Sequence, residues 1–375
     1  MMQEVTDTSG KKNHWRKYCM LIILVTICFI YLFQENMFTL NGTINQQGNN
    51  TMSKPRNYST YAYGDDCFEI FWAKYANHQI RKNSGQEDSR VLHDMIDANR
   101  NITRKNRTCN TYLTLNDPQG GAGNLLFKIA ALIGVAKRHG FLPRTTFNNH
   151  RIFKWFELPH IYYRFPATNS ILVKEERHEY QTVVETLDTS RNWTLGGFRQ
   201  SWRYFANATN EVRQMFTLKA EYTDKAKGFL RNISSPDAVN VCVHVRRGDM
   251  LQKVTIKRGN TPSDPAYLKR SMDYFRNRFN NRRVNFVIIS DDMKWCKNNT
   301  SGPDVFFSPF QTDVLDFALM VCCDHVIVTI GSFGWWGAWL SGGITVYFSA
   351  WPTKGSSLDR DLNKTDYFPD NWISM

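Results

Sequence analysis

The strongest constraint on the fold is a set of short, almost continuously apolar segments in the second half of the chain. These are residues 239–245 (VNVCVHV), 285–290 (NFVIIS) and 325–330 (HVIVTI). Strands that are apolar on both faces are typical of a parallel sheet covered by helices on both sides. Helical patterns at 266–279 and near 312–321 lie between them, so the sequence predicts alternating strands and helices.

The first half of the chain opens with a similar unit. Residues 111–116 alternate between polar and apolar side chains, which indicates a strand. A glycine-rich turn, Gly120 to Asn124, follows, and residues 125–140 have the pattern of a helix that ends in basic residues and a glycine. A strand, a glycine turn and a helix form the opening of a βαβ unit.

These patterns predict an α/β protein with two Rossmann-like, doubly wound domains that face each other. We place the first at residues 111–237 and the second at 238–375, with the ligand at the carboxyl ends of the strands. Residues 34–110 are expected to be a stem and an amino-terminal extension. Their first part, 36–60, is rich in Asn, Gln, Thr, Ser and Gly, which is typical of a solvated linker.

Residues 18–33 form the one long uncharged apolar run of the chain and follow four basic residues. A helix of sixteen residues spans about 24 Å at 1.5 Å per residue, which suits a thin secretory-pathway membrane. The basic flank keeps residues 1–17 in the cytosol. A cleaved signal peptide is the alternative, but no small-residue cleavage site closes the run. We expect a transmembrane signal-anchor at 18–33 and a type II membrane protein.

The glycosylation motif Asn-x-Ser/Thr supports this orientation, because all eleven copies lie after the apolar run. They are Asn41, Asn49, Asn57, Asn101, Asn106, Asn192, Asn207, Asn232, Asn298, Asn299 and Asn363. Such motifs are modified in the secretory lumen, so we expect the bulk of the chain to lie there.

The net charge suggests an anionic partner, because the chain contains 47 lysines and arginines but only 34 aspartates and glutamates. A luminal location excludes nucleic acid and favours a phosphorylated or nucleotide-linked substrate. The aromatic content of 14% excludes a mainly disordered chain.

Six cysteines lie beyond the apolar run and would enter an oxidising compartment. They are Cys67, Cys109, Cys242, Cys296, Cys322 and Cys323. Six cysteines allow fifteen full pairings. We expect disulfides Cys67–Cys109 and Cys296–Cys323, with Cys242 buried in its strand as a small apolar residue. No CxxC or Cys/His spacing indicates zinc.

The segment HVRRGD, residues 244–249, begins in an apolar strand and continues just past its end. Side chains at such a strand end project into the crevice where doubly wound sheets bind ligands. The fork of an arginine matches the paired oxygens of a phosphate. The alternative interpretation is a surface ion pair of Arg246 or Arg247 with Asp249.

A second segment, GSFGWWGAWL at 331–340, also follows a buried strand. A glycine turn before a helix lets backbone N–H groups approach a phosphate. We assign Trp335, Trp336 and Trp339 mainly to packing.

A third motif, Ser290-Asp291-Asp292, ends another predicted strand. Two adjacent carboxylates could hold a metal, but the spacing differs from the D-x-D that glycosyltransferases use to chelate manganese. Nearby basic residues could neutralise a pyrophosphate instead, so we predict no essential metal.

Together these segments resemble the galactoside α-1,2-fucosyltransferases, glycosyltransferase family 11, over about residues 111–372. The resemblance rests on GGAGNLLFKIAALIGVAKRHG, LGGFRQSWRYF, HVRRGD, SDDMKWCKNN and DFALMVCCDHVIVTIGSFGWWGAWLSGG. It implies a type II Golgi membrane enzyme with a GT-B fold and a luminal catalytic domain. It further implies transfer of L-fucose from GDP-fucose to the 2-hydroxyl of a terminal β-galactose, with inversion and with no required metal or other cofactor.

The resemblance also implies roles for individual residues. Arg246 would bind the donor pyrophosphate with support from Arg247, which makes both candidate catalytic residues. His244 would lie near the nucleotide and Asp316 near guanine or ribose, while Ser332 and Phe333 would line the donor pocket. Asn124 matches the Asn of the family's glycine turn, and we place it among the donor-binding residues.

This chain departs from the family pattern next to Asn124. It has Leu125 where the family usually has Gln, and Gly121 where animal members commonly have Arg. These changes bear on the acceptor or fucose contacts. No residue is assigned as the base, because Asp249 fits a role in holding the turn that presents Arg246.

Two other functions fit the same motifs. One is a fucosyltransferase for a different acceptor, such as a core glycan or a protein hydroxyl. The other is an inactive, lectin-like or chaperone protein on the same scaffold. The presence of His244, Arg246 and Asp316 argues against it.

Overall fold

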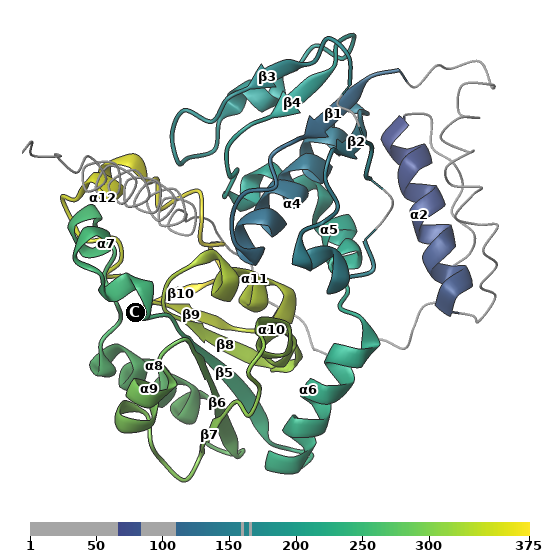
Figure 1. The fold of residues 1–375 in the computed structure, drawn as a ribbon. Helices are drawn as coiled ribbons and strands as arrows, with labels where there is room; N and C mark the ends of the chain where they lie inside the picture. Colours follow the sequence, from purple (N-terminus) through teal and green to yellow (C-terminus); the bar gives the residue numbers. More distant parts are fainter. Residues whose placement is uncertain (1–66, 84–109, 159–160, 165–166) are drawn as a thin grey trace, which may run out of the picture.

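The computed structural model describes residues 67–83, 110–158, 161–164 and 167–375. Within these residues the chain forms two parallel sheets, one in each half of the molecule (Figure 1). The four-stranded sheet has the order β2-β1-β4-β3, and the six-stranded sheet has the order β10-β9-β8-β5-β6-β7. An α/β fold with parallel sheets is therefore confirmed.

The four-stranded sheet belongs to the amino-terminal half. Its strands are β1 (Tyr112–Leu115), β2 (Leu142–Thr145), β3 (Ile171–Val173) and β4 (Trp193–Leu195). The helices of this half are α2 (Cys67–Asn83), α4 (Ala122–His139), α5 (Thr209–Met215) and the 3-10 helices Arg151–Lys154, Thr182–Glu185, Trp202–Tyr204 and Ala206–Ala208. Helix α6 (Ala220–Ile233) leads from this half to the other (Figure 1).

The six-stranded sheet belongs to the carboxy-terminal half. Its strands are β5 (Val239–Val245), β6 (Val284–Ser290), β7 (Val305–Phe307), β8 (His325–Val328), β9 (Thr345–Tyr347) and β10 (Ile373–Ser374). Its helices are the 3-10 helix Asp249–Leu251 and α7 (Lys253–Arg258), α8 (Pro265–Arg278), α9 (Met293–Asn299), α10 (Asp313–Cys322), α11 (Ser332–Ser341) and α12 (Ser357–Asp361). The strands expected at 239–245, 285–290 and 325–330 are all present, as are the helices between them.

The strand order reverses beside β5, and this reversal fixes the place of a ligand. The chain runs outward from β5 to β6 and β7, then returns to β8 on the other side of β5. Right-handed crossovers therefore place α8 and α9 on one face of the sheet and α10 and α11 on the other (Figure 1). The two connections leave in opposite directions, so a crevice opens at the carboxyl ends of β5 and β8.

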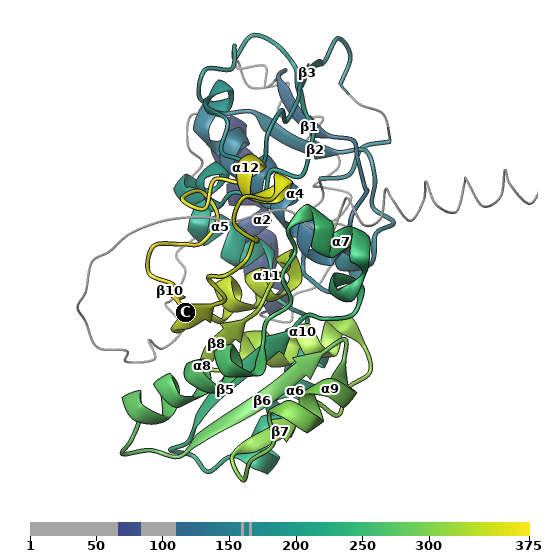
Figure 2. The same ribbon diagram turned by 90° about the vertical axis from the view of Figure 1, so that its left-hand side faces the viewer.

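The two halves share one hydrophobic core, in which α4 packs against α11 (Figures 1 and 2). Trp336 is fully buried, and its ring centroid lies 5.0 Å from Phe127, 5.4 Å from Phe205 and 5.3 Å from Phe216. The three phenylalanines belong to the amino-terminal half. The packing role predicted for the tryptophans of α11 is confirmed, and these side chains join the halves.

Helix α4 begins earlier than expected. It starts at Ala122, so Gly123 and Asn124 belong to its first turn and the glycine turn is shorter than predicted. Its end is as expected, because Gly140 has φ 74°, a left-handed conformation that favours glycine. The early start brings the amino end of α4 up to α11.

Helix α2 was not expected, although its buried apolar residues recur at the spacing of a helix. Phe68, Trp72 and Tyr75 are buried, and the Tyr75 hydroxyl donates a hydrogen bond to the Glu157 carbonyl oxygen at 2.7 Å. Part of the range 34–110, expected to be a stem and extension, thus packs on the amino-terminal half.

The predicted disulfide Cys296–Cys323 is wrong, because both cysteines are free. Cys296 lies in α9 on one face of the sheet, and Cys323 follows α10 on the other face, beside the buried thiol of Cys242. Cys242 is free and buried as expected. Cys67 is disulfide-bonded, and its expected partner Cys109 lies outside the described residues.

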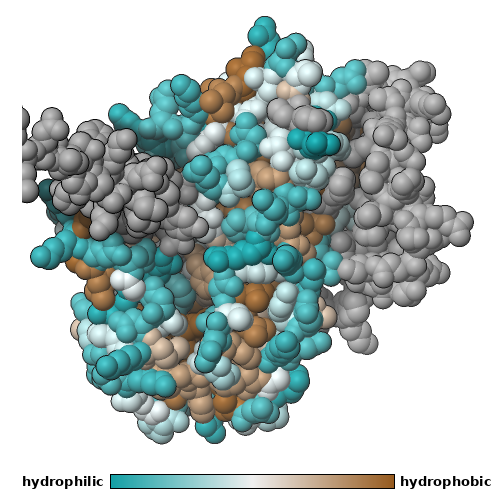
Figure 3. Space-filling view, in the orientation of Figure 1, coloured by the Kyte–Doolittle hydropathy of each residue, from teal (hydrophilic) through white to brown (hydrophobic). Residues whose placement is uncertain are grey.

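The surface facing the viewer in Figure 1 is hydrophilic over most of the described residues (Figure 3). None of the helices in the described part is long and apolar enough to cross a membrane. The span expected at 18–33 lies outside that part, as do the predicted tail 1–17 and the polar linker 36–60.

Candidate active site

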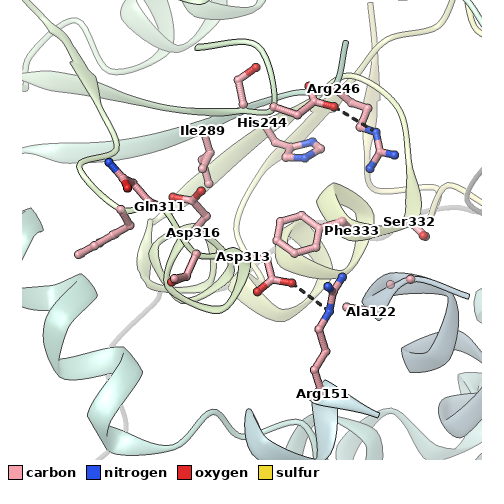
Figure 4. A pocket seen from close by; sticks show the side chains of 16 residues that line it. Ala122, Arg151, His244, Arg246, Ile289, Gln311, Asp313, Asp316, Ser332 and Phe333 are labelled. Carbon is pink, nitrogen blue, oxygen red and sulfur yellow. Dashed lines mark ion pairs between the residues drawn. The ribbon is translucent and has the colours of Figure 1, made fainter. Parts of the chain in front are cut away.

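A cavity of about 340 Å³ opens beyond the carboxyl ends of β5, β6 and β8 and is lined by both halves of the molecule (Figure 4). The carboxy-terminal half contributes His244 near the end of β5, Arg246 just after it, residues 310–313 and Asp316 before and within α10, and the start of α11. The amino-terminal half contributes the first turn of α4 and Arg151. The cavity lies at the crevice that the strand reversal predicts.

Arg246 lines this cavity and is held by two aspartates. Its Nε and Nη2 atoms donate to the Asp249 carboxylate at 3.0 and 3.1 Å, and Nε lies 3.4 Å from an Asp291 oxygen. Its backbone N–H donates to the Thr329 hydroxyl at 2.9 Å. The ion pair with Asp249, considered from the sequence as an alternative, is therefore present. It also orients the guanidinium at the cavity wall.

Arg247 points away from the cavity. Its guanidinium lies 3.8 Å from the centre of the Trp295 ring, and its Nε lies 3.3 Å from an Asp292 oxygen. Its backbone N–H donates to Asp291 at 2.7 Å, so it shares with Arg246 the carboxylate of Asp291. The geometry gives Arg247 a supporting place behind Arg246.

His244 lies in the cavity wall and is only 6% exposed. Burial lowers its pKa to about 4, so the imidazole is neutral at physiological pH. The ring Nδ1 is buried with no hydrogen-bond partner among the described residues. A side chain on Gly334 would reach within 2.4 Å of this Nδ1, so the glycine is what leaves room for the ring. A neutral imidazole has one nitrogen that donates and one that accepts, so this side chain can form a hydrogen bond with a ligand.

The amino ends of α4 and α11 meet at the cavity. A Cβ atom on Gly123 would lie 2.4 Å from the Ser332 backbone, so this close approach requires glycine. Gly331 precedes α11 with φ 96° and offers no side-chain cap. The free N–H groups and dipoles of two helices thus face one cavity, which is an arrangement that binds anions.

Ser332 and Phe333 line the cavity, whereas Asn124 lies behind it. Asn124 is 1% exposed, and its Oδ1 accepts a hydrogen bond from the Ser332 hydroxyl at 2.7 Å and another from Gln200. The structure therefore brings Asn124 to the site through Ser332, as a link between the two halves.

Asp316 lines the cavity and accepts a hydrogen bond from the Ser308 hydroxyl at 2.5 Å. Its burial in the wall raises the pKa of the carboxyl to about 6. The carboxylate can accept hydrogen bonds from a ligand as well.

Sequence reasoning missed Arg151 and Asp313, whose side chains both line the cavity. The Arg151 Nε lies 3.0 Å from an Asp313 oxygen, and the pair crosses from one half to the other (Figure 4). Neither residue belongs to a motif that predicts a site. Their meeting follows from the packing of the two halves.

The model of glycosyl transferase family 11 matches residues 80–375. This chain belongs to glycosyl transferase family 11. A galactoside alpha-(1,2)-fucosyltransferase of Bos taurus is 31% identical over 279 residues, which cover 69% of this chain and 75% of that protein. The corresponding protein of Homo sapiens is 31% identical over 274 residues, covering 69% and 73%. The resemblance inferred from the motifs is thereby confirmed.

Two solved structures are also similar to this family 11 chain. FUT1 of Arabidopsis thaliana, in a mutant form with GDP, has a TM-score of 0.47 and 10% identity, over 78% of this chain and 80% of that chain. NodZ alpha-1,6-fucosyltransferase, soaked with GDP-fucose, has a TM-score of 0.40 and 14% identity, over 61% and 92%.

The aspartates of the predicted Ser290-Asp291-Asp292 motif are engaged by protein groups. Asp291 faces Arg246 and the backbone of Arg247, while Asp292 accepts a hydrogen bond from the Trp295 backbone N–H at 3.1 Å. In the described part of this family 11 chain, no group of three or more His, Cys, Asp or Glu could hold a metal ion.

The raised pKa of Asp316 gives a pH-dependent prediction. The pKa of Asp316 is about 6 in the folded state, against the ordinary value of 3.8. Between pH 3.8 and 6 folding therefore takes up a proton, and at higher pH the ionised carboxylate opposes folding. We expect Asp316→Asn to raise the melting temperature at pH 7.5. The gain should shrink as the pH falls below about 6 and should vanish well below 3.8, where the wild-type carboxyl is protonated in both the folded and the unfolded state. Thermal unfolding across this range tests it, and a lower melting temperature at pH 7.5 contradicts it.

Proposed function

We propose that this chain is an inverting galactoside α-1,2-fucosyltransferase that transfers L-fucose from GDP-β-L-fucose to the 2-hydroxyl of a terminal β-galactose. The observation that carries the proposal is the cavity at the strand reversal, where Arg246 and two uncapped helix ends converge. A diphosphate fits this combination of a guanidinium fork and free backbone N–H groups. The names of the relatives supply the sugar and the linkage.

The proposed chemistry needs positive charge at the leaving group. As the bond between C1 of fucose and the β-phosphate oxygen breaks, negative charge grows on GDP and positive charge on the sugar ring. Arg246, preorganised by Asp249 and Asp291, stabilises the departing diphosphate. The 2-hydroxyl of galactose attacks C1 from the opposite face, which inverts the anomeric centre, and its proton passes to water or to the departing GDP. Arg247 holds Asp291 in place.

The nucleoside end of the donor fits the other end of the cavity. The Asp316 carboxylate accepts hydrogen bonds from guanine or from the ribose hydroxyls, and Phe333 forms an apolar wall beside the base. His244 lies between the two ends, at the level of the phosphates. In this proposal residues 238–375 bind the donor and residues 111–237 bind the acceptor, which is the division of a GT-B enzyme.

We also propose that the protein is a single-pass type II protein of the Golgi membrane with its catalytic part in the lumen. The uncharged run at 18–33, its basic flank and the eleven glycosylation motifs beyond it support this placement. Immunofluorescence and sensitivity of the glycans to endoglycosidase test it.

The direct test of the proposed reaction is a product analysis. The purified full chain, incubated with GDP-fucose and a simple β-galactoside in the presence of a metal chelator, should form one product. We expect a 2-linked α-fucosyl galactoside, identified by linkage analysis, at a rate that the chelator leaves unchanged. Fucose on a different position or only on core glycans or proteins would assign a different acceptor. No turnover with any acceptor would contradict the transferase.

A further inference from the structure

Arg151 brings a second permanent positive charge to the cavity from the opposite half of the molecule. It lies in the 3-10 helix Arg151–Lys154, and its side chain extends across the cavity toward α10 (Figure 4). Among the described residues of the lining, the permanent cations are Arg151 and Arg246. The lining of the cavity also contains three aspartates, Asp291, Asp313 and Asp316.

The formal charge of this lining is unfavourable for a diphosphate. With a neutral imidazole, two arginines and three aspartates give 2 − 3 = −1. The charge of Arg246 is moreover already shared by two carboxylates, because its Nε lies 3.0 Å from an Asp249 oxygen and 3.4 Å from an Asp291 oxygen. A ligand with at least two negative charges therefore needs more than Arg246 beside the helix ends, and the other permanent cation of the described lining is Arg151.

Arg151 is suited to become that cation. The side chains of the Arg151–Asp313 pair are 55% and 38% exposed. Ion pairs this exposed contribute little to stability, so the pair costs little to open. A guanidinium bound to phosphate forms charge-assisted, bidentate hydrogen bonds, which are about twice as strong as neutral ones. A diphosphate carries more negative charge than one carboxylate, so exchange of the carboxylate for a phosphate is favourable.

We propose that Arg151 is a second ligand of the donor diphosphate, which leaves Asp313 and binds the phosphates when the nucleotide enters. The inference rests on the proposed function and extends it. The donor is then held from both halves of the molecule, by Arg246 on one side and Arg151 on the other. Arg151 also neutralises charge on the leaving group as fucose departs.

The test compares two variants that break the same ion pair. Binding of GDP and of guanosine to the full chain is measured by calorimetry for wild type, Arg151→Ala and Asp313→Asn. For Arg151→Ala we expect GDP affinity to fall about 10- to 100-fold, as for the loss of a charged hydrogen bond. Guanosine, which has no phosphate, should bind within about twofold of wild type. For Asp313→Asn, the ratio of GDP affinity to guanosine affinity should stay the same or rise.

A different pattern is expected if the Arg151–Asp313 ion pair only holds the two halves together. If both variants lower the GDP-to-guanosine ratio equally, or if Arg151→Ala weakens both ligands by the same factor, Arg151 is not a diphosphate ligand. Both side chains are partly exposed, so we expect both variants to fold like the wild type. Equal melting temperatures of the three proteins would exclude misfolding as the cause of a lower affinity. A wild-type chain that binds no GDP overturns the proposed function itself. A wild-type chain that binds GDP, with an unaffected Arg151→Ala, overturns only this inference.

Discussion

Replacement of Arg246 by alanine is expected to lower the rate of fucose transfer by about two to three powers of ten. The guanidinium is the cavity cation of the carboxy-terminal half, and its fork is held in position before the donor arrives. Its loss leaves the charge of the departing GDP without a preorganised partner. The measurement is kcat for transfer to a β-galactoside at saturating donor.

Arg246→Lys separates charge from shape. An ammonium keeps the positive charge but cannot supply the planar fork, so we expect most of the loss to remain. A matched control is Arg191→Ala, because Arg191 is 61% exposed and its Nε pairs with Asp188 at 3.0 Å, outside the cavity. That variant should keep the wild-type rate. Full activity of Arg246→Ala would remove this residue from the donor site.

Replacement of Trp336 by alanine is expected to destabilise the protein by about 3–5 kcal/mol, the usual cost of truncating a buried large aromatic side chain. Trp336 is completely buried and its ring contacts Phe127, Phe205 and Phe216 of the other half. The cavity left behind lies between the two halves. We therefore expect a lower free energy of unfolding in chemical denaturation. We also expect the two halves to unfold in separate transitions.

Trp336→Phe is the control for this prediction. The indole N–H of Trp336 has no hydrogen-bond partner among the described residues, so phenylalanine leaves no group newly unpaired. It fills most of the space and should lose clearly less stability than alanine. Equal losses in the two variants would show that packing volume at this position does not join the halves.

Much of the carboxy-terminal half could be predicted from local pattern. The apolar segment 239–245 is β5 at the same residues, because a strand buried on both faces needs apolar side chains at nearly every position. Gly140 ends α4 as expected, because the left-handed conformation there is a local requirement. The positions of Arg246 and Ser332 at strand ends follow from the same segments.

Other features could not be predicted, since they depend on contacts far apart in the chain. The buried aromatic residues of α2 have a helical spacing, but the partners against which the helix packs lie some 80 residues or more away. The directions of Arg246 and Arg247 differ although they are neighbours, because Trp295 and Asp292 hold only the second. Cys296 and Cys323, the expected disulfide partners, lie on opposite faces of a sheet, which the sequence does not show.

The sequence by itself determined strands β1, β5, β6 and β8, the main helices next to them and the residues at their ends, because hydrophobic periodicity and glycine stops act over a few residues. It also determined the family through motifs at those ends. The tertiary structure decided which ends meet. Strand order beside β5 and the aromatic packing of α11 on α4 bring Arg151 to Asp313 across 162 positions of chain. Such approaches arise from burying apolar surface between distant segments, which no local pattern records.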